Sequence, residues 1–157
     1  MKQTIWDKYW QESKISNLDE VITNDPLYRL LKRLIKFPSY KKNLKILEAG
    51  CGSGIRTLAL LKEFQKYHLR CTLVDLSKEA LLLAKKNAEQ NNIKATFLTA
   101  NIFKLPFPDE SFDVVWNEGV IEHFDGKKRY EIFQEMARVC KINGQIIVIS
   151  PNALNPF

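Results

Sequence analysis

Residues 47 to 55 read "LEAGCGSGI", in which glycine occupies every second position from 50 to 54. The residues just before the glycines, 44 to 49, form a short apolar run that suits a buried strand. The residues after them, "SGIRTLALLKEFQKY" from 53 to 67, have helical spacing, and Ser53 is placed to cap that helix. The stretch therefore predicts a strand, a glycine turn and a helix in succession.

Strands and helices continue to alternate along the rest of the chain. Strands are predicted at 44–50, 70–76, 94–100, 112–117 and 145–150, and helices at 53–67, 77–92 and 125–144. Ser77 is placed to cap the second of these helices and Gly144 to close the third. Because such alternation builds right-handed crossovers, we expect a doubly wound α/β fold around a mainly parallel sheet.

The chain before this alternating region is predicted to be helical. One amphipathic helix is expected at 4–16, with Trp6 and Trp10 on one side, and a second is expected to begin at Pro26 and to end before Pro38. We interpret the aromatic side of the first helix as an ordinary packing face, and a lid over a ligand is the alternative. The predicted organisation is one domain, 1–157, with a helical segment at 1–43 and an α/β core at 44–152.

Composition narrows the class of protein. The formal net charge is +6, yet the basic residues are scattered along the chain, so we expect a solvated surface and not a nucleic-acid partner. No apolar stretch is long enough to span a bilayer, and the charged N-terminus lacks the apolar centre of a secretion signal. The sequence therefore predicts a cytoplasmic protein.

The cysteines and histidines indicate neither disulfides nor a metal site. Cys51, Cys71 and Cys140 are widely spaced and odd in number, which favours three reduced thiols. The chain has only two histidines, and no cysteine lies in a His–Cys cluster. We predict no metal.

The glycine turn indicates where a ligand binds. In an open parallel sheet, ligands bind beyond the carboxyl ends of the strands, and glycines there let a ligand touch the main chain. A dinucleotide cofactor prefers G-x-G-x-x-G, but Ile55 stands at the last position of that pattern. S-adenosylmethionine carries no pyrophosphate, so this spacing favours it. Asp75, at the end of the second strand, is placed to accept both hydroxyls of an adenosine ribose.

Four segments together resemble the successive motifs of class I S-adenosylmethionine-dependent methyltransferases of the small-molecule type. They are "ILEAGCGSG" from 46, "VDLSKEALLLAKKNAEQ" from 74, "ANIFKLPFPDESFDVVWNEGVIEHF" from 100 and "MARVCKINGQIIVISPN" from 136. The resemblance runs from about residue 44 to 152 and implies a Rossmann-like core. It also implies further antiparallel strands after the fifth strand, for which this sequence has no counterpart, so the chain resembles a C-terminally short member of the family.

The resemblance implies a set of cofactor-binding residues. Glu48 would lie near the ammonium group of the methionine moiety, Asp75 would hold the ribose, and Leu76 would pack against adenine. Asn101 stands where the family usually has Asp, and with Ile102 it would meet the amino edge of adenine. The implied S-adenosylmethionine site comprises Glu48, Gly50, Cys51, Gly52, Asp75, Leu76, Asn101, Ile102 and Asn117.

Methyl transfer by in-line displacement requires chiefly that the protein align the reacting atoms. His123 is the candidate general base, since the ordinary pKa of histidine is near neutral, and packing under a loop is the alternative role. Glu118 and Glu122 lie at helical spacing and are interpreted as acids of a first helical turn, or as groups that face the acceptor.

The sequence thus predicts a methyltransferase acting on a small-molecule or lipid-like acceptor. Two alternatives remain: a non-catalytic cofactor-binding subunit or fragment that needs a partner chain, and a nicotinamide-dependent oxidoreductase. The fifth predicted strand, "QIIVIS" from 145, would form an apolar sheet edge that invites association. We therefore expect a homo-oligomer or a partner chain to cover that edge.

Overall fold

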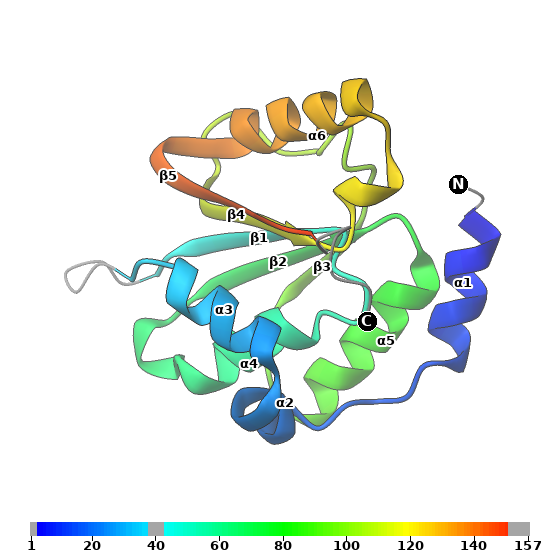
Figure 1. The fold of residues 1–157 in the computed structure, drawn as a ribbon. Helices are drawn as coiled ribbons and strands as arrows, with labels where there is room; N and C mark the ends of the chain where they lie inside the picture. The colour runs from blue at the N-terminus through cyan, green and yellow to red at the C-terminus, as the bar shows by residue number, and fades with distance from the viewer. Residues whose placement is uncertain (1–2, 38–42, 151–157) are drawn as a thin grey trace.

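Five strands form one sheet in which every neighbouring pair is parallel (Figure 1). The computed structural model describes residues 3–37 and 43–150. The strand order is β3-β2-β1-β4-β5. The strands are β1 (Lys45–Ala49), β2 (Arg70–Asp75), β3 (Thr96–Thr99), β4 (Phe112–Glu118) and β5 (Cys140–Ile149). The predicted parallel α/β fold is confirmed, and the order reverses between β1 and β4, where such sheets bind ligands.

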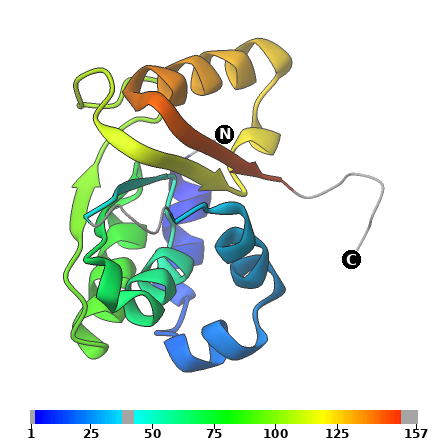
Figure 2. The ribbon, with the colours of Figure 1, turned by 90° about the vertical axis from the view of Figure 1, so that its left-hand side faces the viewer.

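Helices cover both faces of the sheet (Figures 1 and 2). On one face lie α2 (Leu18–Asn24), α3 (Pro26–Leu34), α4 (Ile55–Glu63) and α5 (Lys78–Gln90), whereas α6 (Gly126–Val139) covers the other. The first helix, α1 (Gln3–Glu12), packs against α5. Two short 3-10 turns, η1 (Gln65–Tyr67) and η2 (Ile121–His123), complete the elements of the described residues.

Alternate residues of the central strands point to opposite faces and build two separate cores. Ile46 and Trp116 belong to the core beneath α3 and α4, while Leu47 and Val115 pack with Met136 beneath α6. All five side chains are fully buried. Because both faces are covered, the strands at the centre of the sheet are apolar almost throughout, as expected for parallel strands.

The N-terminal segment differs from the single helix predicted at 4–16. The helix α1 ends at Glu12, where the Ser13 hydroxyl donates to the carbonyl of Tyr9 (2.8 Å). A separate helix, α2, follows, and Asn17 caps it by accepting from the N–H of Asp19 (2.9 Å). Asparagine and serine compete with the helix through such local side-chain bonds, which explains the break.

The next helix, α3, begins at Pro26 as predicted and ends at Leu34. Asp25 caps it by accepting from the N–H groups of Leu27 (2.7 Å) and Tyr28 (3.0 Å). Pro38, which was expected to stop the helix, and positions 151–152 of the predicted core lie outside the described residues.

The prediction that the last helix continues to Gly144 is wrong, because α6 ends at Val139 and β5 begins at Cys140. Cys140 already pairs with Phe112, and the register between β4 and β5 then shifts. A side chain at Gly144 would come within 3.0 Å of the backbone oxygen of Asp113. The glycine therefore permits a close approach between two strands at a bulge and does not mark a helix end.

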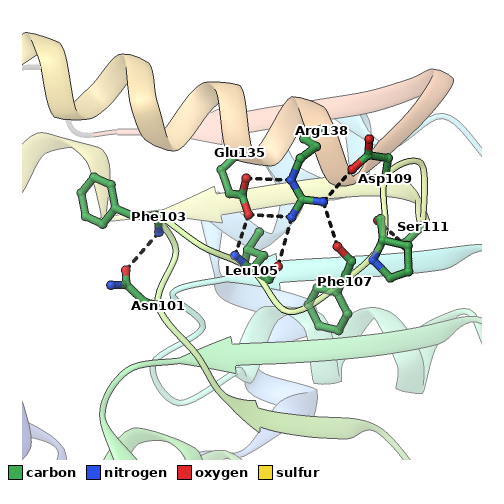
Figure 3. A network of polar contacts seen from close by, with 9 residues as sticks. Asn101, Phe103, Leu105, Phe107, Asp109, Ser111, Glu135 and Arg138 are labelled. Atoms are coloured by element: carbon green, nitrogen blue, oxygen red, sulfur yellow. Dashed lines mark hydrogen bonds and ion pairs between the residues drawn. The ribbon is translucent and has the colours of Figure 1, made fainter.

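Arg138 of α6 fastens the loop between β3 and β4 to that helix (Figure 3). Its guanidinium donates to the carbonyl oxygens of Leu105 (3.0 Å) and Phe107 (2.8 Å), and forms ion pairs with Glu135 and Asp109. Glu135 also accepts from the N–H of Leu105 (2.6 Å). These bonds hold a loop without regular structure in one place, and the same loop begins at the carboxyl edge of the sheet, where the candidate pocket lies.

Candidate cofactor pocket

The glycine turn joins the carboxyl ends of β1 and β2. The N–H groups of Gly50 and Cys51 both donate to the carbonyl of Val74 (2.7 and 2.9 Å). Gly54, with φ +64°, is the N-cap residue of α4, and no side chain caps this helix, so the predicted cap by Ser53 is wrong. A Cβ atom at Gly54 would lie 2.3 Å from Leu73 Cδ2, which explains glycine at this position by close packing of the turn on β2.

The carboxylate of Asp75 connects two strand-to-helix turns. One oxygen accepts from the N–H of Gly52 (2.8 Å) and the other accepts from the N–H of Ser77 (2.9 Å). Ser77 itself caps α5 through the N–H of Ala80 (3.2 Å), as predicted. Burial raises the pKa of Asp75, and the N–H donors oppose part of that shift. The N–H of Leu76 also bonds to this carboxylate, and because a carboxylate has about four lone-pair sites, Asp75 can still accept from a ligand.

A cavity of about 290 Å³ opens beside Asp75 at the carboxyl edge of the sheet. Its wall combines the turn after β1, the turn after β2, the start of the β3–β4 loop and the turn after β4. The lining residues are Trp6, Trp10, Gly50, Asp75, Leu76, Ser77, Ala100, Asn101, Ile102, Phe103, Gly119, Val120, His123 and Phe124. Of the predicted site residues, the cavity brings together Gly50, Asp75, Leu76, Asn101, Ile102 and His123.

Four residues of the predicted cofactor set do not line this cavity. Cys51 is buried within the turn, and Gly52 lies beneath a tryptophan ring. Asn117 is fully buried on the side of α6, where its amide donates to the sulfur of Met136 (3.2 Å). Glu48 is buried, with only 5% of its surface exposed, and its Oε2 atom has no hydrogen-bond partner within the described part of the chain.

Two tryptophans from α1 were not predicted as site residues, and the face that was interpreted as an ordinary packing face also reaches the cavity. Trp6 and Trp10 line the cavity, and their rings stack at 6.5 Å between centroids. A Cβ atom at Gly52 would lie 2.5 Å from the Trp10 ring. The edge of His123 meets Trp6 at 5.1 Å. We call Trp6 and Trp10 the roof of the pocket, and their spacing of four residues on a helix was the available signal.

The guanidinium of Arg56 pairs with two carboxylates, one of which is at the end of β4. Arg56, in the first turn of α4, pairs with Asp25 (3.0 Å) and with Glu118 (2.9 Å). Burial raises the pKa of Glu118. Glu118 ends β4 and Glu122 lies in η2, so the expectation that both acids belong to one helical turn is wrong. The pairing joins α3, α4 and β4 behind the pocket.

The site fits an adenosyl group with an amino-acid tail. Gly50 lines the cavity, and its lack of a side chain leaves main chain at the wall, whereas Gly52 is covered by the Trp10 ring. Asp75 offers the acceptor oxygens that a ribose diol needs, and Asn101 and Ile102 line the same cavity. The partnerless Glu48 oxygen, just before the turn, suits a cationic group of a ligand.

Within 3–37 and 43–150, no three His, Cys, Asp or Glu side chains come together as metal ligands. No helix among the same residues has the length and apolar character needed to cross a bilayer. The three cysteines are all free and buried.

Comparisons with known proteins agree with this geometry. Residues 47–148 match a family model described as a methyltransferase domain. Ajmaline N-methyltransferase of Rauvolfia serpentina is 30% identical over 131 residues, covering 79% of this chain and 43% of that protein. YcgJ of Bacillus subtilis, described as an uncharacterized methyltransferase, is 29% identical over 117 residues, covering 74% of this chain and 44% of that protein. The chain thus spans less than half the length of these relatives.

Solved structures show the same fold. The crystal structure of YcgJ has a TM-score of 0.64 at 26% identity, covering 78% of this chain and 48% of that one. The PH0226 protein of Pyrococcus horikoshii OT3 has a TM-score of 0.67 at 26% identity, covering 90% of this chain and 64% of that one. The chain belongs to the methyltransferase-domain family, class I enzymes whose methyl donor is S-adenosylmethionine.

Proposed function

We propose that this chain binds S-adenosylmethionine and transfers its methyl group to a small-molecule or lipid-like acceptor. The observation that carries the proposal is one cavity in which the Asp75 carboxylate, the main chain of Gly50 and the aromatic roof meet. The family match supports the donor. A nicotinamide-dependent oxidoreductase, the other enzyme considered from the sequence, receives no support from the family match.

The adenosyl end of the proposed site uses groups from three turns. Asp75 accepts from the ribose hydroxyls through the lone pairs that its backbone partners leave free. Leu76 is half-exposed and offers an apolar surface to adenine. Asn101 already accepts from the N–H of Phe103 (3.0 Å), so its side chain is fixed at the cavity wall beside Ile102.

The methionine end lies between the glycine turn and the turn after β4. A Cβ atom at Gly50 would lie 2.5 Å from Val120 Cγ2, so a side chain at position 50 would collide with the turn after β4. Glu48 lies directly before this turn, and we assign to it the ammonium group of the amino-acid tail. Its buried, partnerless oxygen loses favourable hydration in the free chain and regains an interaction when a cation approaches.

S-adenosylmethionine, when bound, supplies an electrophilic methyl group that a nucleophile displaces in line. The contribution of the chain is alignment, together with exclusion of water by the roof. His123 lines the cavity and has an exposed ring held edge-on to Trp6. We propose that it accepts the proton of the acceptor nucleophile.

The character of the cavity supports a small organic acceptor. Trp6, Phe103 and Phe124 provide aromatic surface, and the polar groups are few, which is typical of small-molecule sites. The name of the Rauvolfia relative indicates that it methylates nitrogen in a small alkaloid. Among the described residues that line the cavity, none is lysine or arginine, so a nucleic acid is not the proposed acceptor.

Replacing Asp75 by Ala tests the cofactor site. Loss of both ribose acceptors is expected to weaken S-adenosylmethionine binding by about a hundredfold, because hydrogen bonds to a charged group contribute about 1.5–3 kcal/mol each. Isothermal titration calorimetry measures this, and circular dichroism verifies the fold. Asp19→Ala, at an exposed carboxylate of α2, is the matched control and should bind normally. If the wild-type chain does not bind, or if Asp75→Ala binds as well as wild type, the assignment fails.

The assigned role of Glu48 predicts a pH dependence. Burial, reinforced by Glu118, raises the pKa of Glu48 well above its ordinary value, so the free chain holds a proton there at acidic pH. A bound ammonium favours the carboxylate, so binding releases that proton and affinity rises with pH. The rise begins at the lower pKa that Glu48 has beside the bound ammonium and levels off above the raised pKa of the free chain. Calorimetry across this range should show a steeper rise for wild type than for Glu48→Gln; parallel curves would contradict the role.

The proposed role of His123 separates catalysis from cofactor binding. His123→Phe keeps a ring against Trp6 but cannot accept a proton. On an acceptor found by a panel screen, we expect kcat to fall by about a hundredfold or more. S-adenosylmethionine affinity should stay within about twofold of wild type. His68→Asn, distant on the C-cap of η1, is the control. An unchanged kcat in His123→Phe would leave only a packing role.

We also propose that another polypeptide covers β5. Among the described residues β5 is an edge strand, and its Ile142 is largely exposed. A second copy or a partner chain would satisfy that edge, and a subunit that binds cofactor without turnover is the matching alternative function. Size-exclusion chromatography with light scattering should show self-association at high concentration; a monodisperse monomer would argue against a second copy.

A further inference from the structure

Asn87 is a buried polar residue on α5 that does not line the cavity. The buried residues of this helix are Ala80, Leu81, Leu83, Ala84, Asn87 and Ala88, and Asn87 alone among them is polar. Its side chain is fully buried. An apolar residue would serve the core equally well at this position, whereas a buried amide is costly unless its partners are supplied.

Both ends of the Asn87 carboxamide bond to backbone far away in the sequence. Its Nδ2 atom donates to the carbonyl of Ser53, 34 residues away (3.1 Å). Its Oδ1 atom accepts from the N–H of Ser16, 71 residues away (3.0 Å). Ser53 belongs to the glycine turn, and Ser16 belongs to the connection between α1 and α2. The amide therefore links the turn to the segment that carries the roof.

A second contact joins the same two parts of the chain on the pocket side. The Trp10 ring lies against Gly52, the residue before Ser53. Gly52 also donates its N–H to Asp75. Because Ser53 follows Gly52 in the chain, a shift of the Ser53 carbonyl that bonds to Asn87 would also move Gly52. It would thereby change both the hydrogen bond from Gly52 to Asp75 and the contact of Gly52 with Trp10.

We infer that Asn87 is a positioning residue for the cofactor pocket, which sets the glycine turn and the α1 roof relative to one another. The inference rests on the proposed function only in that S-adenosylmethionine is the ligand whose affinity reports on it. Asn87 acts through the turn and the roof and touches no ligand. Its loss should lower affinity although every residue of the cavity wall remains unchanged.

Two substitutions at Asn87 distinguish the loss of one of its hydrogen bonds from the loss of both. Asn87→Asp keeps an oxygen for the Ser16 N–H but places a second oxygen against the Ser53 carbonyl. Asn87→Leu removes both bonds at similar volume. Asn91→Asp is the control, since Asn91 lies one turn further along α5 and donates to the Asn87 carbonyl, not to the glycine turn. Calorimetry gives the affinity for S-adenosylmethionine, and thermal unfolding gives Tm for each variant.

Both Asn87 variants are expected to bind S-adenosylmethionine about tenfold more weakly, since one or two buried hydrogen bonds hold the turn. Asn91→Asp should bind within about twofold of wild type even where its Tm falls. Equal affinity losses in Asn87→Leu and Asn91→Asp, or no loss in either Asn87 variant, would overturn the inference. A wild-type chain without affinity would instead refute the proposed function, so the two failures are distinguishable.

A readout without ligand tests the link to the roof. Acrylamide quenching of tryptophan fluorescence reports on Trp6 and Trp10, because Trp116 is fully buried. Quenching should increase in Asn87→Asp and stay unchanged in Asn91→Asp. In a double-mutant cycle on affinity, Trp10→Ala and Asn87→Leu should lose less together than the sum of their separate losses. Unchanged quenching, or additive losses, would show that Asn87 does not act through α1.

Discussion

The carboxylate of Asp75 is the constraint on which the pocket depends. By accepting from Gly52 and Ser77, it ties the turn after β1 to the turn after β2. Two strands that are merely neighbours in a sheet thereby acquire turns of fixed relative position. The Asp75 carboxylate also lines the cavity. The hydrogen bonds that fix the two turns therefore also fix the orientation of this carboxylate. The side chain that fixes the two turns is therefore also the one to which we assign the ribose of the proposed cofactor.

The glycines serve contacts within the chain as well as contacts with a ligand. A side chain at Gly52 would collide with Trp10, and one at Gly54 would collide with Leu73. The contact of Gly52 with Trp10 allows α1 to lie over the pocket, and the contact of Gly54 with Leu73 brings the turn close to β2. The alternation of glycine that suits a ligand is thus also required by packing, which means that substitutions in this turn change the roof and the cofactor site together.

Sequence patterns predicted those parts of the fold that are determined by interactions between residues close together in the chain. The strands, the Pro26 helix start and the Ser77 cap follow from apolar runs and capping residues, and the fold class follows from their alternation. The boundary at Val139 and Cys140 could not be found in this way, because pairing with Phe112 decides it. Likewise, a helix break at Ser13 depends on one side-chain bond that helical spacing does not reveal.

The same distinction holds for the site. Residues at the ends of strands, such as Asp75 and Asn101, reach the cavity because parallel strands end at one edge. Trp6 reaches it only through the packing of α1 on α5, a contact between segments far apart in the sequence. Asn117 shows the converse, since it follows the motif but faces Met136 within the core. Strand alternation sends its side chain to the α6 side.

Two buried carboxyl groups, which lower the stability of the ligand-free chain when they are charged, lie at the carboxyl edge of the sheet. Burial raises the pKa of both Glu48 and Asp75, and the Oε2 atom of Glu48 has no partner among the described residues. A folded chain retains such costs only where surrounding packing tolerates them, and they fall when a ligand with complementary charge arrives. Under the proposed assignment, cofactor affinity and chain stability are coupled at this edge of the sheet, because a ligand that binds only the folded chain lowers the free energy of that state.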